Sequence, residues 1–346
     1  GQDVGGVFVA TLDGADVDGH VGASHGADRL PHARRQTVDG QRRPARALAV
    51  GTHRFGPLVA GIESQVILHD VAHVVLMLIR APKALHRHIE DVAVFVSQSG
   101  ETKDVLNSVK VMRQRGGQVL GVLNVLGSTL MHQSDAYLPL ACGYEISVPA
   151  TKTFVNQAVL FLYLAHRLAG HDTGELDTLP DLLAQTIEAT DGPAREVATY
   201  LHDWDDMYYL GYGLTHPIAL EAALKLKEIT YAHCEGAFSS EFKHGPLSAV
   251  YDGYPVLFIT APGDEMMMIN HVNEVTTRGG RAVALAAEHS ALRSNVHDYL
   301  VVPDSDRFTS PILATIPAQL VAYYMSVARG IDPDFPRNLS KTLTVD

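Results

Sequence analysis

From about residue 46 onward, short runs of apolar residues alternate with longer segments in which apolar positions recur every three or four residues. The short runs are typical of buried strands, and the longer segments are typical of helices with one face in a core. Helices are predicted at residues 102–113, 151–168, 217–233 and 312–329. Strands are predicted at residues 47–50, 73–78, 92–96, 119–123, 208–211, 256–259, 282–286 and 299–302. This alternation indicates an α/β fold with parallel sheets.

Two stretches depart from the alternation. Residues 1–44 contain many Gly, Asp, His and Arg residues and little apolar periodicity, which predicts an irregular N-terminal extension. Residues 181 to about 197 carry several Asp, Glu and Thr residues, which predicts a bridging helix and linker. We therefore expect the extension at 1–44, a first domain at 45–180 and a second domain at 198–346.

An internal repeat indicates that the two domains are related. Residues 94–135 resemble a segment that lies 163 positions further along the chain. The identical pairs are Phe95 and Phe258, Gly100 and Gly263, the Arg-Gly-Gly triplets at 115–117 and 278–280, and Asp135 and Asp298. General αβ patterning without common ancestry is the alternative explanation. We expect two tandem domains, each a doubly wound parallel sheet flanked by helices in three layers.

Composition and charge narrow the class of protein. The chain of 346 residues has 27 Lys and Arg against 39 Asp and Glu, a formal net charge of −12, and no long basic run. A nucleic-acid partner is therefore not expected, because such binding needs clustered cations. Cys142 and Cys234 are the only cysteines, which excludes a disulfide scaffold and fits a reducing cytoplasm. No apolar run reaches the ~18 residues of a membrane span.

A hydroxyl-rich loop follows the strand predicted at 92–96. Its sequence is Ser97-Gln98-Ser99-Gly100-Glu101-Thr102, and a predicted helix begins at its end. Backbone N–H groups and hydroxyls at a helix N-terminus suit a phosphate monoester, although an ordinary helix cap is the alternative. The repeat has Thr-Ala-Pro-Gly-Asp-Glu at 260–265, which keeps the turn and loses the hydroxyls. We expect the first domain to bind the anion and its copy not to.

Charged residues lie on one face of the predicted helix at 217–233. Lys225 and Glu228 are three positions apart, and Glu221 lies one turn before Lys225. A solvated face with ion pairs is the common meaning of this spacing. Leu224 and Ile229 make the helix largely apolar, however, and charges in apolar surroundings are candidates for a functional site.

Five motifs together resemble sugar isomerase (SIS) domains and, in detail, the isomerase half of the glutamine–fructose-6-phosphate aminotransferase family. They are SQSGET at 97–102, YEISVPATK at 144–152, EAALKLKEITYAHCEG at 221–236, SEFKHGPLSAV at 240–250 and DFPRNLSKTLTVD at 334–346. The resemblance covers roughly residues 90–346 and, more faintly, 46–90. It implies two SIS domains.

The resemblance also implies catalytic roles for four residues. The family residue that matches Glu228 moves a proton between C1 and C2 of a sugar phosphate, and the one that matches Lys341 forms a Schiff base. The residue that matches His244 assists ring opening from across a dimer interface, and Lys225 corresponds to a lysine beside them. The matching substrate-binding positions are Thr52, Ser97, Gln98, Ser99, Thr102, Val148 and Ser340.

Some positions differ from the family pattern. Val-Gly-Thr-His stands at 50–53, where the family has Cys-Gly-Thr-Ser. Ser147, Pro149 and Ala150 stand where the family usually has Gly, Ala and Ser. These differences concern the binding pocket, so they bear on substrate preference more than on the class of reaction.

The expected function is isomerisation of fructose 6-phosphate toward glucose 6-phosphate or, with ammonia, glucosamine 6-phosphate. A glucosamine-6-phosphate deaminase and a non-catalytic sugar-phosphate sensor are the alternatives. Residue 1 is Gly1 rather than a nucleophilic cysteine, so we expect a separate ammonia source or glutaminase as partner. We also expect a cytoplasmic homodimer with no cofactor and no metal.

Overall fold

The computed structural model describes residues 92–341 of the chain. The extension predicted at 1–44, the strands predicted at 47–50 and 73–78, and Thr52 lie outside the described residues.

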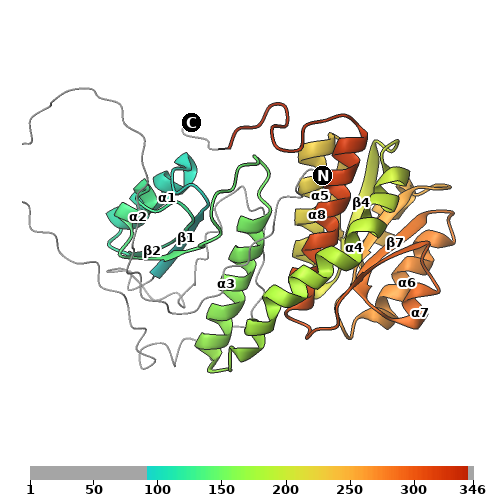
Figure 1. The fold of residues 1–346 in the computed structure, drawn as a ribbon, viewed down its shortest axis with the longest axis horizontal. Coiled ribbons are helices and arrows are strands. Elements are labelled where there is room, and N and C mark those ends of the chain that lie inside the picture. Colours follow the sequence, from blue (N-terminus) through green and yellow to red (C-terminus); the bar gives the residue numbers. More distant parts are fainter. Residues whose placement is uncertain (1–91, 342–346) are drawn as a thin grey trace, which may run out of the picture.

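The first sheet is parallel and has the order β1-β2-β3 among the residues described. Its strands are β1 (Val92–Ser97), β2 (Gln118–Leu123) and β3 (Ala136–Pro139). The helices α1 (Lys103–Gln114) and α2 (Thr129–Gln133) cover one face, where they pack on Phe95 and Leu123. The helix α3 (Lys152–Ala169) covers the other face through Leu160 and Phe161 (Figure 1). Successive strand residues therefore point into two different cores.

The second sheet is also parallel and has the order β5-β4-β6-β7-β8. Its strands are β4 (Asp206–Gly211), β5 (His233–Phe238), β6 (Pro255–Ile259), β7 (Arg281–Ala287) and β8 (Asp298–Val302). Leu257 and Ile259 face a core formed with α4, α5 and α8, whereas Val256 and Phe258 face a core formed with α6. Both faces of β6 are buried, which is why its sequence reads as a continuous apolar run.

Helices cover this second sheet on both sides, as the doubly wound prediction requires. The helices α4 (Leu179–Leu201), α5 (His216–Thr230) and α8 (Ser310–Ala328) lie on one face. The helices α6 (Glu265–Thr276) and α7 (Ser290–Arg293) lie on the other, together with the short 3-10 helices η4 (Phe242–His244) and η5 (Pro246–Ala249). The prediction of an α/β fold with two tandem three-layer domains is confirmed.

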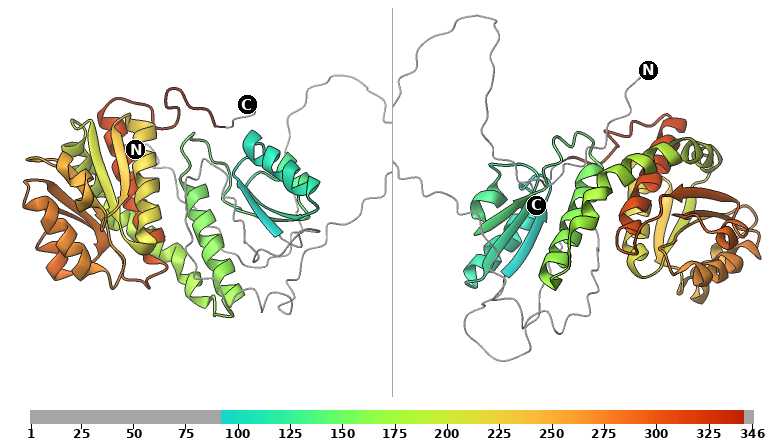
Figure 2. Two further views of the ribbon diagram at one scale, coloured as in Figure 1. Left: turned by 180° about the vertical axis from the view of Figure 1, so that it is seen from behind. Right: turned by 60° about the horizontal axis from the view of Figure 1, so that its bottom comes forward.

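The segment predicted as a bridging helix and linker at 181–197 is a longer element. The helix α4 runs from Leu179 to Leu201 and follows the short turn η2 (Gly174–Thr178). Leu183, Val197 and Leu201 belong to the core of the second domain, and α4 packs along α8. Figure 2 shows α3 and α4 joined end to end between the two sheets. Of the polar residues that suggested a linker, Asp181, Glu188 and Glu196 lie on the exposed side of an amphipathic helix, whereas Thr186 and Thr190 are buried and donate to backbone carbonyls of the same helix.

The internal repeat is present in three dimensions. Strands β6 and β7 start 163 positions after β1 and β2, and α6 follows β6 as α1 follows β1. Gly100 and Gly263 both have positive φ, at 67° and 92°. Asp135 and Asp298 each pair with an arginine of their own domain. The shared positions therefore keep the same local roles, which supports common ancestry over general patterning.

Apart from α4, the largest change in a helix boundary from the sequence prediction is at the end of α5. The helix predicted to reach residue 233 ends at Thr230, because Tyr231 adopts a left-handed conformation at φ 61° and stops it. His233 then begins β5, which was not predicted because it is an edge strand with only Cys234 fully buried. The strand β3 and the helices α2, α6 and α7 were not predicted either.

The helix α8 is the one described helix long and apolar enough to cross a membrane, with 19 residues and a mean hydropathy of 1.3. About three quarters of it (72%) is buried inside the molecule, against α4, α5 and the second sheet. Its composition therefore fits a core helix.

Gly211 provides a test of the tight turn from β4 into α5. A Cβ on Gly211 would lie 2.4 Å from the carbonyl oxygen of Thr215, a backbone atom that has no freedom to move aside. We expect Gly211→Ala to lower the free energy of unfolding by about 1–3 kcal/mol. Gly192, on the exposed side of α4 with nothing within 4 Å, is the control. There Gly192→Ala should change stability by less than about 0.5 kcal/mol, because the crowding of a Cβ before Pro193 offsets the higher helix propensity of Ala. Urea denaturation checks both, and an unchanged midpoint for Gly211→Ala would contradict the account.

Candidate functional site

The hydroxyl loop after β1 is held by its own side chains. Ser97 is buried, and its Oγ accepts the Gly100 N–H at 3.0 Å and lies 2.9 Å from Thr102 Oγ1. Ser99 Oγ accepts the Glu101 N–H at 3.1 Å. These bonds fold the segment tightly around the start of α1, with Gln98 and Ser99 partly exposed.

The structure argues against an ordinary N-cap of α1, the alternative explanation for the hydroxyl-rich loop. Thr102 occupies the N-cap position of α1 with an extended backbone, yet its side chain makes no capping hydrogen bond to the helix. Its hydroxyl is directed back to Ser97 instead. The first N–H groups of α1 therefore lack a side-chain acceptor from this residue, the arrangement in which helix N-termini bind anions.

The corresponding loop of the second domain has a different chemistry. Asp264 takes the place of Glu101 and is 8% exposed, and burial raises the pKa of its carboxyl. Arg307 lies 3.4 Å from it and lowers that pKa in part. Thr260 is buried where the first domain has Ser97. A buried carboxylate at this position repels an anion, which agrees with the expectation that only the first domain binds one.

The charged face of α5 is buried rather than solvated. Lys225 is 6% exposed, and its Nζ lies 2.6 Å from Glu228 Oε2 and 3.5 Å from Glu221 Oε1. Burial lowers the pKa of Lys225, but the two carboxylates raise it further, so the pKa lies above its usual value. Lys225 therefore remains an ammonium group at neutral pH, in a low-dielectric setting where its charge acts strongly.

A small cavity of about 10 Å³ lies beside this pair, between α5 and α8. Glu221, Lys225, Thr315 and Gln319 contribute its polar lining. Its size is that of a single water molecule at most, and most of its surface is apolar, from Ile218, Ala222 and Ala318.

The C-terminal segment extends from the second domain to the first. The guanidinium carbon of Arg337 lies 4.0 Å from the centre of the Tyr231 ring. The backbone N–H of Arg337 donates to the Tyr231 hydroxyl at 2.8 Å. Further along the segment, Lys341 Nζ donates to the carbonyl of Ser147, in the loop before α3. Lys341 is thereby brought from a distant part of the sequence to the same region as Lys225 and Glu228.

The environment of Lys341 lowers the pKa of its amine. Burial lowers its pKa, and Lys225 lowers it further, whereas Glu145, Cys142 and Glu228 raise it, with a net value below the usual one. A lysine acts as a nucleophile only when neutral, so this shift suits covalent chemistry at a carbonyl group.

Asn124 connects the hydroxyl loop to the region of Lys341. Its N–H donates to the Gln98 carbonyl at 3.1 Å, and its Oδ1 accepts the Cys142 N–H at 3.2 Å. Its Nδ2 donates to Gly143 at 2.7 Å. Burial raises the pKa of the neighbouring Cys142 thiol to about 11, so this thiol stays protonated.

His244 is not part of this cluster within the single chain. It is exposed at the end of η4. Its neighbour Phe242 packs on the ring of Tyr208, and its neighbour Lys243 forms an ion pair with Glu274 of α6. The helix α6 covers the opposite face of the sheet from α5. Within residues 92–341, no hydrogen bond or ion pair connects His244 to Lys225 or Glu228.

The remaining predicted positions have mixed outcomes. The Val148 N–H is already used by the Asp334 carbonyl at 2.9 Å. Ser340 is exposed beside Lys341. Thr52 lies outside the described residues.

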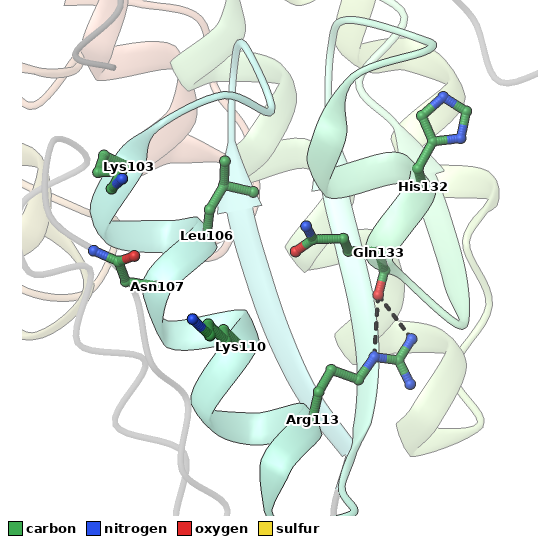
Figure 3. A pocket seen from close by; sticks show the side chains of 7 residues that line it. All are labelled: Lys103, Leu106, Asn107, Lys110, Arg113, His132 and Gln133. Atoms are coloured by element: carbon green, nitrogen blue, oxygen red, sulfur yellow. Dashed lines mark hydrogen bonds between the residues drawn. The ribbon is translucent and has the colours of Figure 1, made fainter. Parts of the chain in front are cut away.

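A larger hollow of about 540 Å³ lies between α1 and α2 and is not part of this cluster. Lys103, Lys110, Arg113 and His132 contribute to its lining (Figure 3). Arg113 already donates two hydrogen bonds to the Gln133 carbonyl and pairs with Asp135. Figures 1 and 2 place α1 and α2 on the far side of α3 from α5. Lys225 on α5 is therefore remote from it, and Lys341 is not among the residues that line it.

Sequence reasoning missed several residues that hold the cluster together. Asn124 contacts the segment before α3, Glu145 ties that segment to the start of α3, and Tyr231 contacts the C-terminal segment. For Glu145 and Tyr231, their positions inside the motifs at 144–152 and 221–236 were the only available signal.

Comparisons with known proteins agree with this architecture. The family model described as "SIS domain" matches residues 72–167 and 200–329. A glutamine–fructose-6-phosphate aminotransferase (isomerizing) of Pyrobaculum aerophilum is 43% identical over 265 residues, or 74% of this chain and 44% of the relative. One of Chlorobaculum tepidum is 32% identical over 344 residues, covering 94% of this chain and 54% of the relative. The chain thus spans about half the length of these curated relatives.

Solved structures show the same fold. The C-terminal domain of a glucosamine-fructose-6-phosphate aminotransferase from Francisella tularensis superposes with a TM-score of 0.65 and 32% identity, covering 71% of this chain and 73% of that one. A glucosamine-6-phosphate deaminase from Thermotoga maritima also reaches 0.65, covering 75% and 77%, but at 24% identity it shows the fold alone.

The buried ion pair on α5 predicts a specific stability effect. Lys225→Met removes the cation shared by Glu221 and Glu228 and leaves their carboxylates close together in a buried setting. We expect a loss of about 3–5 kcal/mol of unfolding free energy at pH 7. The loss should shrink at acid pH, because protonation removes the uncompensated charge. Lys227→Met, an exposed position on the same helix, should change stability by less than about 0.5 kcal/mol. Equal effects of the two variants in urea denaturation would refute the burial argument.

Proposed function

The chain belongs to the SIS-domain family, and from this membership we propose that it converts fructose 6-phosphate by aldose–ketose isomerisation, giving glucosamine 6-phosphate when ammonia is present and glucose 6-phosphate when it is not. One observation supports this proposal most strongly. Lys341, with a lowered pKa, lies close enough to Lys225 and Glu228 for their charges to act on it.

The proposed first step is binding of the phosphate. Ser97, Ser99 and Thr102, with Gln98 and the N–H groups at the start of α1, would hold its oxygens. This placement leaves the carbon chain of the sugar free to extend toward Asn124 and Lys341.

The proposed covalent step uses Lys341. Its neutral amine adds to the C2 carbonyl of the open-chain sugar, and loss of water gives an imine between C2 and Nζ. Ammonia then displaces Lys341 from C2, and Glu228 carries a proton from C1 to C2. The carbonyl group is then at C1 and the amino group at C2. With water in place of ammonia, the ketone is restored, and the same proton shift through an enediol gives glucose 6-phosphate.

Lys225 would assist without changing its charge. Its ammonium lies 2.6 Å from Glu228, which orients that carboxylate, and its repulsion lowers the pKa of Lys341. Each of these effects increases the reactivity of the groups that act on the sugar.

Two further parts of the proposal concern partners. His244 faces away from the cluster of its own chain, so we propose that ring opening uses the His244 of a second copy in a homodimer. The ammonia would come from free ammonium or from a glutaminase activity.

The buried, protonated thiols of Cys142 and Cys234 suit a reducing compartment, and we propose a cytoplasmic location.

Borohydride trapping tests the covalent step. Incubation with fructose 6-phosphate and then borohydride should add a sugar phosphate to the peptide that contains Lys341, as seen by mass spectrometry. Lys341→Arg keeps the positive charge but cannot form the imine, so it should abolish both trapping and product formation. Parallel incubation with glucosamine 6-phosphate tests the deaminase direction. Sugar-phosphate binding with no trapped adduct and no turnover in either direction would leave only the sensor alternative.

The lowered pKa of Lys341 predicts the pH dependence of trapping. Imine formation needs the neutral amine, so its rate should rise with pH and level off above the pKa of Lys341. Because that pKa lies below the ordinary lysine value of 10.5, the midpoint should lie below 10.5 as well. A rate that still increases steeply at pH 10.5 would show that Lys341 is not held in this environment.

A further inference from the structure

The loop between Glu145 and Thr151 receives the C-terminal segment and is itself held by one buried carboxylate. We propose that Glu145 is a positioning residue for Lys341, because its carboxylate fixes this loop in the shape that accepts the C-terminal segment. The inference rests on the proposed function only in assigning a chemical role to Lys341.

Glu145 anchors the loop to the start of α3. Glu145 is buried, at 8% exposed. Its Oε2 accepts hydrogen bonds from the Thr153 N–H at 2.8 Å and from the Thr153 hydroxyl at 2.7 Å. Weaker bonds come from the Thr151 N–H at 3.3 Å and the Thr151 hydroxyl at 3.2 Å. A carboxylate at a helix N-terminus also interacts favourably with the helix dipole. Four donors thus converge on one buried group.

The loop fixed in this way contacts the C-terminal segment at three points. Ser147 Oγ donates to the Pro333 carbonyl at 3.3 Å, and the Val148 N–H donates to the Asp334 carbonyl at 2.9 Å. The Ser147 carbonyl accepts Lys341 Nζ. Two of these contacts use backbone atoms, so they depend on the shape of the loop more than on its side chains. Loss of the Glu145 anchor would therefore disturb all three together.

Glu145 has a second, electrostatic effect on the same lysine. The charged and titratable groups that face Lys341 are Glu145 and Cys142 from the segment before α3, and Lys225 and Glu228 from α5. Among them, Glu145 has the largest influence and raises the pKa, while burial of the docked segment lowers it by more. The structural and the electrostatic effects of Glu145 thus have opposite signs, which makes them separable.

Two variants of Glu145 separate the effects. Glu145→Gln keeps an oxygen acceptor for Thr153 and removes the charge, so the segment should stay docked and the pKa of Lys341 should fall below the wild-type value. Glu145→Ala removes the anchor, so the segment should undock and the pKa should rise toward the ordinary lysine value as burial is lost. A purely structural role in the stability of α3 would move neither value.

The measurement is the pH profile of Lys341 modification by an amine reagent such as methyl acetimidate. It uses the full chain without sugar, with mass spectrometry of the peptide that contains Lys341. Asp306→Ala is the matched control, because Asp306 also accepts two backbone N–H groups, from Phe308 and Thr309 at the start of α8. It should leave the midpoint at the wild-type pH.

The expected result is a lower midpoint for Glu145→Gln, a higher one for Glu145→Ala and no shift for the control. Imine trapping should fall at least about tenfold in Glu145→Ala and much less in Glu145→Gln. If Glu145→Ala does not fold, Thr153→Val, which removes one donor to the same carboxylate, should raise the midpoint in the same direction.

Midpoints that stay at the wild-type value in both Glu145 variants would overturn the proposal. A shift in the same direction for both variants would overturn it as well, because the two effects would then not be separate. The reagent needs no sugar, so the result stands whether or not the wild-type protein forms an imine with fructose 6-phosphate.

Discussion

The groups that we assign to the proposed site lie on different domains, and the C-terminal segment contacts both domains. Lys225 and Glu228 belong to α5 in the second domain, and the hydroxyl loop belongs to the first. Lys341 meets the Ser147 carbonyl of the first domain while Arg337 is held on Tyr231 at the end of α5. Each of these contacts is modest alone, at about 1 kcal/mol for a hydrogen bond. The site therefore depends on several of them acting at once.

Burial gives these groups their chemistry. On α5, two carboxylates keep Lys225 charged although burial opposes it. On the C-terminal segment, burial and the charge of Lys225 lower the pKa of Lys341. Two lysines in one site thus have opposite shifts, one suited to orienting charge and one suited to nucleophilic attack. Separation of this kind is typical of sites that carry out acid, base and covalent steps together.

Much of the architecture could be predicted from the sequence, since apolar runs indicate buried strands such as β6 and the repeat indicates a second copy of the domain. The hydroxyl loop and the α5 residues were also found in this way. The edge strand β5 was missed because few of its residues are buried. A bridging helix and linker was predicted at 181–197, but the extent of α4 and its packing in the core of the second domain were not. The anchoring role of Tyr231 could not be predicted, because it depends on a contact with Arg337, 106 positions further along the chain. The role of Glu145 was missed although its partners Thr151 and Thr153 lie only six and eight positions away, because the spacing alone does not show that its carboxylate is buried. The placement of His244 on the face opposite α5 could not be predicted either, because it depends on how the chain crosses the sheet.

Amide hydrogen exchange with and without fructose 6-phosphate tests the central claim most directly, that one sugar phosphate engages both domains and the C-terminal segment. The account predicts that the sugar slows exchange in three separate segments, at residues 97–103, 147–151 and 334–341, while the copy loop at 260–265 is unaffected. Protection confined to the second domain, or protection of 260–265 without 97–103, would contradict it.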